Sequence, residues 1–464
     1  MTILAVDFGS TYTKGALIAE DGAVLGTAST PTTGTQGHGD ILDGYRALRA
    51  TLAVPEDAVV RACSSAGGGL RLAVVGYERT VTAQAGHRVG LSAGAKVVRV
   101  AAGELTTAGG AGVRAARPDI ILLVGGTDGG NSNVLLHNAA RLAKAAIGGH
   151  GAHAVPVVVA GNIEARAEAA AVLAESGRPT LLADNVLPQI GVIAPESARA
   201  AIRHAFLRHV IGGKGLSRDP AFAAMVEAAT PDVVLRGVEV LASVTDGDVL
   251  VVDVGGATTD VYSCLSPEGE DSGLRKDVVA PLWHARTVEG DLGMRWNAEH
   301  VLEAAESEHL LASVPDPGAL KAYAARVHER PGSLPVDDVE GALDLEMARL
   351  AALVAVRRHA RPAQPTESAR PLANVVSLVG SGGVLRHAGA AGRDHVLGAV
   401  LADHAGGWKV PRSARATVDT AYLLFVAGLL ATEPNSSEPS AQDDDRNNGN
   451  GNELARTLAR AITL

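Results

Sequence analysis

The chain opens with short apolar runs separated by polar turns. Residues 3–8, 14–19 and 23–28 are such runs, separated by a Gly/Thr-rich turn and by the Glu-Asp-Gly sequence at 20–22. This alternation is typical of strands joined by hairpins, so it predicts an antiparallel three-stranded start. A further β-branched run, Val59–Ser64, ends in AGGG and continues as a helical pattern. Together these segments predict a mixed sheet with helices.

The pattern changes from about Pro118. DIILLVGG leads into a helical pattern at 133–146, PVVVAGN leads into another at 163–175, and TLLADN leads into a Pro/Gly turn. Strands that alternate with helices predict βαβ units and a parallel sheet. Much later, Val375–Val379 is expected to be the last strand, followed by GSGG and by helices to about Ala431.

Two turns along the chain resemble each other. VDFGSTYTKGAL (Val6–Leu17) and VDVGGATTDVYS (Val252–Ser263) each follow an apolar strand. A strand end of this kind delivers its Asp into a cleft, where the carboxylate can hold Mg²⁺ through water. The Gly residues then let backbone N–H groups approach phosphate oxygens, and Thr or Ser hydroxyls add donors. A single turn of this kind is more typical of a tight β-hairpin, but two copies predict two related lobes around one phosphate site.

These patterns divide the chain into five parts. We assign a first lobe to 1–80, an α/β insertion to 81–235, a second lobe to 236–431, a disordered linker to 432–453 and a short helix to 454–464. The linker has Ala441 as its only apolar residue, so it cannot bury enough surface to offset the entropy of ordering. The final segment has Leu454, Leu458 and Ile462 at helical spacing and is expected to dock on the body or on a partner.

Charge, cysteine content and hydropathy narrow the class of protein. A net charge of -10 argues against nucleic-acid and acidic-membrane partners, which need a basic footprint. Cys63 and Cys264 are too few for a disulfide framework, and no apolar run reaches the roughly 20 residues that span a bilayer. The N-terminus has no basic segment followed by an apolar one. We therefore expect a cytoplasmic protein.

The two turns resemble the phosphate motifs of the actin, Hsp70 and sugar-kinase superfamily. That resemblance implies the α/β actin-like ATPase fold, in which two ribonuclease H-like lobes clamp ATP or ADP with Mg²⁺ in a nucleotide cleft; here an α/β insertion is added. It implies that Asp7 and Asp253 are catalytic and organise Mg²⁺ through water. Lys14 is either a cation at the phosphates or a solvated strand residue. The implied phosphate contacts are Gly9, Ser10, Thr11 and Thr13 from the first lobe and Gly255, Gly256, Thr258 and Thr259 from the second.

Two further stretches fit the superfamily pattern. NVVSLVGSGGVLRH (Asn374–His387) is an apolar strand that leads through glycines into a helix, as at an adenosine site. The implied adenosine-site residues are Gly380, Ser381, Gly382 and Gly383. TVEGDLGMRWNAEHV (Thr287–Val301) stands where Hsp70-like proteins have a Gly-Asp loop near the nucleotide. Glu289 and Asp291 are therefore candidates for a catalytic base or a partner of the metal site, or alternatively they cap the following helix.

Several stretches together are similar to the MutL family, the accessory proteins of glutamate mutase that are unrelated to the mismatch-repair protein of that name. They are VDFGSTYTK, CSSAGGGLRLAVVG, LLVGGTDGGN, VVVAGN, TVEGDLGMR and VGSGGVL. The resemblance implies a slow Mg-dependent ATPase that acts as a reactivating factor. Its client would be an adenosylcobalamin-dependent mutase, whose damaged cobalamin it exchanges for intact cofactor. A small-molecule kinase of the same superfamily and an actin-like assembly protein are the alternatives.

The GGTDGGN turn within the insertion is a candidate ligand or partner loop. It comprises Gly125, Gly126, Thr127, Asp128, Gly129, Gly130 and Asn131. Asn131 or Ser132 would cap the following helix and help to bind an anion. A doubly wound sheet also uses such turns at strand ends without any ligand. His137 and Asn138 on that helix are expected to be surface or packing residues.

Overall fold

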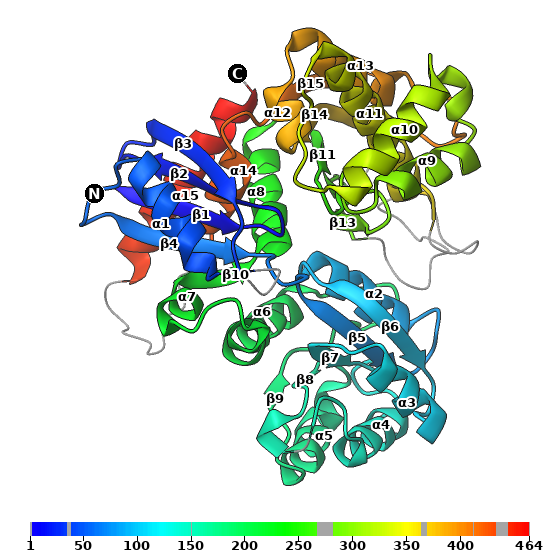
Figure 1. Ribbon diagram of the computed structural model, residues 1–464. Helices are drawn as coiled ribbons and strands as arrows, with labels where there is room; N and C mark the ends of the chain where they lie inside the picture. Colours follow the sequence, from blue (N-terminus) through cyan, green and yellow to red (C-terminus); the bar gives the residue numbers. More distant parts are fainter. Residues whose placement is uncertain are drawn as a thin grey trace.

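The computed structural model describes residues 2–34, 39–149, 151–266, 282–362, 369–411, 413–432 and 444–463. It contains three five-stranded sheets, which form the cores of two lobes and of an inserted domain (Figure 1). Within these residues no helix is both long and apolar enough to cross a membrane.

The first lobe is a mixed sheet with the order β10-β4-β1-β2-β3. Its strands are β1 (Ile3–Phe8), β2 (Tyr12–Ile18), β3 (Val24–Pro31), β4 (Val59–Ser64) and β10 (Val226–Ala229). The first three are antiparallel, as predicted, and β4 and β10 run parallel to β1. Helix α1 (Ile41–Thr51) packs on β2 and β3 and begins after Asp40, its N-cap residue, which forms a capping box with Asp43.

The second lobe repeats this plan with the order β13-β12-β11-β14-β15. Its strands are β11 (Asp248–Val254), β12 (Thr259–Cys264), β13 (His284–Glu289), β14 (Val375–Ser381) and β15 (Arg415–Val418). Its helices are α9 (Ala298–Ser307), α10 (Pro317–Glu329), α11 (Asp338–Ala360), α12 (Gly383–His387) and α13 (Ala390–Ala402). Three antiparallel strands followed by two parallel ones, found twice, confirm the predicted actin-like ATPase fold.

The expectation that Val375–Val379 is the last strand of this lobe is wrong. β15 follows it and pairs in parallel with β14, from Ser377↔Arg415 to Gly380↔Val418. This strand has only four residues, half-buried or exposed, and so it lacks the apolar run that identifies buried strands from sequence.

The insertion is a fully parallel sheet with the order β6-β5-β7-β8-β9. Its strands are β5 (Arg71–Gly76), β6 (Lys96–Ala102), β7 (Ile120–Leu123), β8 (Val157–Val159) and β9 (Thr180–Leu182). Its helices are α2 (Thr82–Ser92), α3 (Thr107–Ala115), α4 (Asn133–Lys144), α5 (Ile163–Glu175) and α6 (Glu196–Ala205). The predicted βαβ units are confirmed.

The predicted limits of the insertion, 81–235, need correction at both ends. β5 was assigned to the first lobe, but it hydrogen-bonds to β6 and β7 in the inserted sheet. Near the other end, α7 (Pro220–Met225) and β10 lead the chain back, and β10 pairs with β4 of the first lobe. Strand pairing over long sequence separations decides both boundaries, and local composition does not record it.

Three helices lie between the lobes. They are α8 (Thr230–Val244), which leads from β10 to β11, α14 (Leu423–Leu430), which follows β15, and α15 (Asp444–Thr463), which packs on both. The predicted linker at 432–453 is therefore partly wrong, because 444–453 belong to α15; residues 433–443 lie outside the described part. The predicted terminal helix exists but begins ten residues earlier than the 454 assigned to it.

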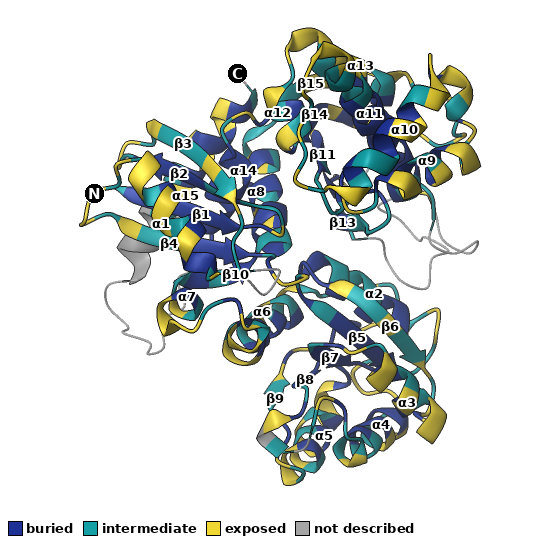
Figure 2. Ribbon diagram, viewed as in Figure 1, coloured by how far each residue is buried: buried dark blue, intermediate teal, exposed yellow. Residues whose placement is uncertain are grey.

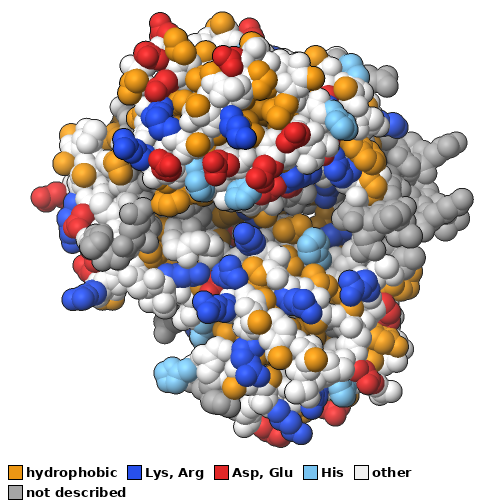
Figure 3. Space-filling view, turned by 45° about the vertical axis from the view of Figure 1, so that its right-hand side comes forward, with side chains coloured by type: hydrophobic (Ala, Val, Ile, Leu, Met, Phe, Trp, Pro, Cys, Tyr) orange, Lys and Arg blue, Asp and Glu red, His pale blue; other side chains and the backbone are white. Residues whose placement is uncertain are grey.

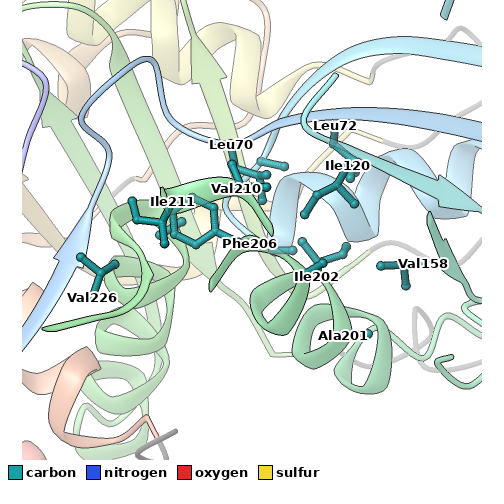
Figure 4. Close-up of a cluster of buried hydrophobic side chains, with 14 of the residues drawn as sticks. Leu70, Leu72, Ile120, Val158, Ala201, Ile202, Phe206, Val210, Ile211 and Val226 are labelled. Carbon is teal, nitrogen blue, oxygen red and sulfur yellow. The ribbon is translucent and has the colours of Figure 1, made fainter. Parts of the chain in front are cut away.

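The hydrophobic core of the first lobe continues into the insertion. Leu4 and Val6 of β1 belong to the same buried cluster as Leu72 of β5 and Ile120 of β7. The bridge between them is built by Ile202 of α6 and by Phe206, Val210 and Ile211, which follow it (Figure 4). This buried cluster thus extends from the first-lobe sheet to the inserted sheet, whereas a second buried cluster lies within the second lobe. Figure 2 shows that β1, β5 and β11 are mostly buried.

Candidate functional site

A cleft with a volume of about 1110 Å³ lies between the two lobes and is bordered by the insertion. In Figure 3 the mouth is a hollow between the second lobe above and the insertion below. Asp and Glu side chains gather on the upper rim and Lys and Arg on the surface below it. The predicted residues that line the cleft are Asp7, Gly9, Ser10, Thr11, Lys14, Asp253, Gly255, Gly256, Thr258, Ser381, Gly382 and Gly383.

The two predicted phosphate turns have the same geometry. Gly9 N–H donates to the Tyr12 carbonyl at 3.2 Å, and Gly255 N–H donates to the Thr258 carbonyl at 3.0 Å. Each closure brings backbone so close to the glycine that a Cβ would lie 2.6 Å from Tyr12 O or 2.8 Å from Thr258 O. Glycine is therefore required at both positions by close approach of the chain.

The two turns meet across the floor of the cleft. A Cβ at Gly256 would lie 3.3 Å from Thr11 Oγ1, so the two turns are nearly in contact at this point. Ser10 and Thr11 on one side and Gly256 and Thr258 on the other thus face a common space. Paired turns of this type present backbone N–H groups and hydroxyls, which suits the oxygens of an anion.

Asp7 is fixed at the end of β1 by neighbours from two other elements. Thr230, the first residue of α8, donates its hydroxyl to Asp7 Oδ1 at 2.6 Å, and Cys63 of β4 has its Sγ 3.7 Å from the same oxygen. Asp7 is 3% exposed. Its other oxygen, Oδ2, faces Lys14 at 3.6 Å.

Lys14 is not a solvated strand residue. It stands opposite Asp7 in the β1–β2 register, lines the cleft, and has its ammonium 5.2 Å from the centre of the Tyr422 ring. Burial alone lowers the pKa of Lys14, but the carboxylates of Asp7 and Asp253 outweigh burial and leave this pKa above its usual value. Lys14 therefore remains charged and places one cation between the two aspartates.

Asp253 is the equivalent of Asp7 at the end of β11. Burial raises its pKa, while the Lys14 cation lowers it, and the Asp260 carboxylate raises it again. Ser381 donates to Asp253 and stands opposite it in the β11–β14 register. Asp260 accepts from Thr258 Oγ1 at 2.8 Å and from Arg286 Nε at 2.8 Å, so its negative charge is balanced by a buried guanidinium.

Three predicted site residues take part in the scaffold instead of lining the cleft. Thr13 is buried and its hydroxyl lies 3.1 Å from that of Thr32. Thr259 is buried and donates to the Leu292 carbonyl at 2.7 Å. A Cβ at Gly380 would lie 2.9 Å from a methyl group of Leu385, so this glycine makes room for core packing. Their predicted nucleotide contacts stay predictions, and each has a structural role in the described contacts.

The glycine turn after β14 lies directly against the second phosphate turn. Gly382 has φ +102°, and a Cβ there would lie 2.1 Å from the Val254 carbonyl oxygen. Beyond it, Arg386 reaches across to the first lobe, where it donates to Thr27 Oγ1 at 2.9 Å. The Arg386 guanidinium also stacks 3.5 Å from the Tyr422 ring centre. The helix after this turn therefore links the second lobe to the first beside the cleft.

Glu289 and Asp291 share one partner outside the cleft lining. Arg358 of α11 donates to Glu289 Oε2 at 2.9 Å and to Asp291 Oδ1 at 2.8 Å. Burial raises the pKa of Glu289, whereas in Asp291 the hydrogen bond and charge of Arg358 outweigh burial and lower the pKa. Neither caps the next helix, because α9 begins after Asn297, which makes no side-chain cap. The capping alternative is wrong, and a catalytic role stays a prediction.

The GGTDGGN loop is tied to the two neighbouring strand ends of the insertion and does not line the cleft between the lobes. Asp128 Oδ1 accepts from Ile163 N at 3.0 Å and from Asn185 Nδ2 at 2.9 Å. Asn162 Nδ2 donates to the Gly130 carbonyl at 3.0 Å, and Asn131 Oδ1 accepts from Asn133 N at 2.8 Å. The structural alternative thus accounts for these contacts, and a ligand role stays a prediction.

The helix after this loop behaves as expected. Asn138 is buried, accepts from Leu105 N at 2.7 Å and donates to the Gly103 carbonyl at 3.0 Å, while His137 is exposed. Among the described residues, no group of three or more His, Cys, Asp or Glu side chains is arranged to hold a metal ion.

Comparison with known proteins identifies the family. The family model described as MutL protein matches residues 3–441. This chain belongs to the MutL family. Protein MutL from Clostridium tetanomorphum is 35% identical over 456 residues, which cover 93% of this MutL chain and 96% of that protein.

Solved structures are more distantly similar to this MutL chain. The nucleotide-free structure of an acetone carboxylase covers 93% of this chain and 70% of its own at 13% identity, with a TM-score of 0.39. A ROK family glucokinase from Streptomyces griseus, in complex with glucose and AMPPNP, covers 92% and 98% at 11% identity, with a TM-score of 0.32. The strand order of the two lobes, and not these distant similarities, identifies the fold.

Several residues of the cleft carry no clear signal in the sequence. Thr230, Lys96 and Tyr422 line it from the starts of α8 and β6 and from the loop before α14. Asp260 could have been found, because it stands seven residues after Asp253 just as Lys14 does after Asp7. The others come from segments that reach the cleft only through long-range folding.

Proposed function

We propose that this MutL chain is an ATP-binding and ATP-hydrolysing chaperone that reactivates an adenosylcobalamin-dependent mutase. The observation that carries the proposal is the pair of equivalent aspartate turns that face one cleft in a chain of the MutL family. Opening and closing of that cleft supplies the motion, and the exchange of damaged for intact cobalamin in the client is the result.

The cleft residues suit Mg²⁺ and a nucleotide. Mg²⁺ prefers oxygen ligands and usually binds through one or two carboxylates together with water and phosphate. Asp7 and Asp253 would hold it, because their carboxylates make this part of the cleft negative, which also keeps the Lys14 ammonium charged. When bound, the ion neutralises phosphate charge. Ser10, Thr11 and Thr258 would then contact the phosphates, with Gly382 and Gly383 beside the adenosine.

The carboxylates at and near the second phosphate turn favour slow hydrolysis over transfer to a small substrate. A kinase needs a carboxylate free to accept the proton of the attacking hydroxyl. Glu289 and Asp291 are held by Arg358, and Asp260 is held by Arg286. The reactivation experiment described below therefore also tests the two alternatives, a kinase and an actin-like filament protein.

Differential affinity links the nucleotide to the client. A ligand shifts a conformational equilibrium only by binding one state more tightly than another. The cleft is lined from both lobes, so a nucleotide that contacts both turns favours the closed state. The insertion, which borders the mouth, is the part we expect to meet the client.

The test is reactivation of an inactivated mutase. A cognate mutase is inactivated with its cobalamin bound and incubated with this protein, intact adenosylcobalamin, ATP and Mg²⁺. Recovery of mutase activity and release of the damaged cobalamin are measured, with Asp253→Asn as the matched control. No recovery above the control would contradict the proposal. ATP turnover stimulated by a metabolite, or nucleotide-dependent sedimentation, would instead favour the kinase or the filament protein.

A further inference from the structure

The inference concerns helix α15, which closes a core built by both lobes. Ala455, Leu458, Ala459 and Ile462 form its buried face, between 0% and 6% exposed. They pack in one cluster with Ile3 and Ile18 of the first-lobe sheet, with Val249 and Val251 of the second-lobe sheet, and with α8 and α14. α15 therefore contributes to a core in which residues of both lobe sheets meet.

The two helices beneath α15 are the ones that join the lobes. α8 runs from β10 to β11, and α14 follows β15. They cross through two glycines, where a Cβ at Gly237 would lie 1.9 Å from Leu424 O and a Cβ at Gly428 1.9 Å from Val233 O. Such close backbone contact leaves little freedom for the pair except sliding or rotation at the crossing. Any change in the angle between the lobes must therefore pass through this crossing.

α15 also reaches one element of each lobe directly. In the first lobe it touches the β2–β3 hairpin, where a Cβ at Gly22 would lie 3.1 Å from a Leu454 methyl group and 3.8 Å from Thr457 Cβ. In the second lobe it contacts β15. Near α14, a Cβ at Gly451 would lie 2.9 Å from the Leu430 carbonyl oxygen. A helix in contact with both lobes and with both connecting helices resists their relative movement.

The family model matches residues 3–441, so α15 begins just beyond the matched part. It is attached by the one helix face that carries Ala455, Leu458, Ala459 and Ile462, while Arg456 and Arg460 on the opposite face are exposed. An amphipathic helix of this kind can leave its groove without unfolding the two lobe sheets, whose strands are paired independently of it.

We propose that α15 is a built-in brake on the separation of the lobes. When docked, it holds α8 and α14 in one crossing and slows release of the nucleotide. When it lifts away, the lobes separate more readily. This regulation rests on the proposed nucleotide-binding function, but the movement of the helices does not.

The experiment uses the full chain and three variants. Gly22→Cys with Thr457→Cys allows a disulfide, because a Cβ–Cβ distance of 3.8 Å matches the usual bridge, and the native Cys63 and Cys264 are buried. Gly22 has φ +90°, which strains a cysteine there, so oxidised and reduced forms of this one variant are compared. Leu458→Ser weakens docking, and Arg456→Ser, on the exposed face of the same helix, is the matched control.

Two measurements separate the brake from the function on which it rests. The first is the rate at which a fluorescent ADP analogue is released. We expect roughly tenfold faster release in Leu458→Ser, as for a coupling of ordinary size, slower release in the oxidised than in the reduced double variant, and no change in Arg456→Ser. The second is hydrogen exchange of the α8 and α14 amides without nucleotide, which should rise in Leu458→Ser and fall on oxidation.

Each outcome has a defined meaning. If no nucleotide binds but hydrogen exchange changes as expected, the proposed function fails and the brake stands. If the exchange of α8 and α14 is the same in oxidised, reduced and Leu458→Ser proteins, the brake is overturned. If Leu458→Ser also loosens the insertion, which has no extensive contact with α15 among the described elements, that variant has lost its fold, and the oxidised and reduced forms decide.

Discussion

The first and second lobes share a backbone plan but differ in the charges that they bring to the cleft. In each lobe a central strand ends in an aspartate, followed by a glycine turn closed by one hydrogen bond. The residue opposite the aspartate in the neighbouring antiparallel strand is Lys14 in the first lobe and Asp260 in the second. The two copies of the repeat therefore place equivalent residues alike. Because one copy has Lys14 where the other has Asp260, the two sides of the cleft differ in charge.

The parallel neighbour differs as well. Cys63 stands opposite Asp7, whereas Ser381 stands opposite Asp253 and donates to it. Asp7 obtains its strong hydroxyl contact from Thr230 of α8 instead. Equivalent carboxylates are thus held from different elements, and the hold on Asp7 depends on a helix that connects the lobes.

The largest expected effect comes from removing either aspartate. Asp7→Asn and Asp253→Asn should each lower Mg-dependent ATP hydrolysis by roughly 100-fold or more, because the ion loses a charged ligand. Hydrolysis and thermal shift with Mg-ATP measure the effect, and Asp246→Asn, an exposed aspartate outside the cleft lining, is the control. If both variants keep full Mg-dependent hydrolysis, the proposal that Asp7 and Asp253 together hold Mg²⁺ is wrong.

A second comparison sets Gly382 against Ser64, which occupies the corresponding position beside the first turn. Gly382→Ala should lower the free energy of unfolding by about 2 kcal/mol or more, because φ is positive and the Cβ meets the Val254 carbonyl. Ser64→Ala removes a buried hydroxyl that donates to the Phe8 carbonyl at 3.3 Å and accepts from Ala66 N at 3.2 Å, and should cost about 1 kcal/mol. Chemical denaturation compares the two, and equal losses would show that the turns tolerate side chains alike.

Lys14 and Asp260 should have opposite effects on the pH dependence. The Lys14 cation lowers the pKa of Asp253 and the Asp260 carboxylate raises it. In Lys14→Met the pKa of Asp253 rises further, so Mg-ATP binding should be lost at a higher pH on the acid side. The affinity of Lys14→Met for Mg-ATP at neutral pH should fall by about tenfold. In Asp260→Asn the acid limb should move to lower pH. Calorimetric titrations at a series of pH values measure both, and shifts in the same direction would be inconsistent with this assignment.

The smallest effect concerns how β12 and β13 are joined. His359 lies between Ser263 and Thr287 at 2.9 Å from each hydroxyl, whereas the first lobe uses the Thr13–Thr32 hydroxyl pair, which does not titrate. Burial, and then the charge of Arg370, hold the pKa of His359 well below its usual value, so it stays neutral when folded.

The unfolded chain binds a proton at this histidine below about pH 6.5, and stability is therefore lost as the pH falls through that value. Between pH 6.5 and 5.5 the parent protein should lose about 1 kcal/mol from this group, and His359→Gln should lack that loss. Urea unfolding at both pH values measures it. If the variant loses as much free energy of unfolding between the two pH values as the parent protein does, other groups cause the acid sensitivity.

The sequence predicted the repeat well and the connections poorly. Val6–Leu17 and Val252–Ser263 could be recognised because each keeps an apolar strand, an aspartate and a glycine turn within a few residues. Strands β5 and β10 were misplaced because their sheet is decided by partners far away in the chain. Glu289 and Asp291 were proposed because their stretch stands where Hsp70-like proteins have a Gly-Asp loop, and only the fold shows that Arg358 holds them.

The core that contains Phe206 and joins the insertion to the first lobe affects how the insertion moves. Because this core joins the insertion to the first lobe, the two should turn together when the second lobe swings about the crossing of α8 and α14. The lighter contact between α2 and β13 is then where the movement appears first. Displacement grows with distance from the axis of a rotation, and α4 and α5 lie at the far end of the insertion in Figure 1. A small angular change at the cleft therefore becomes a long stroke at those helices relative to the second lobe.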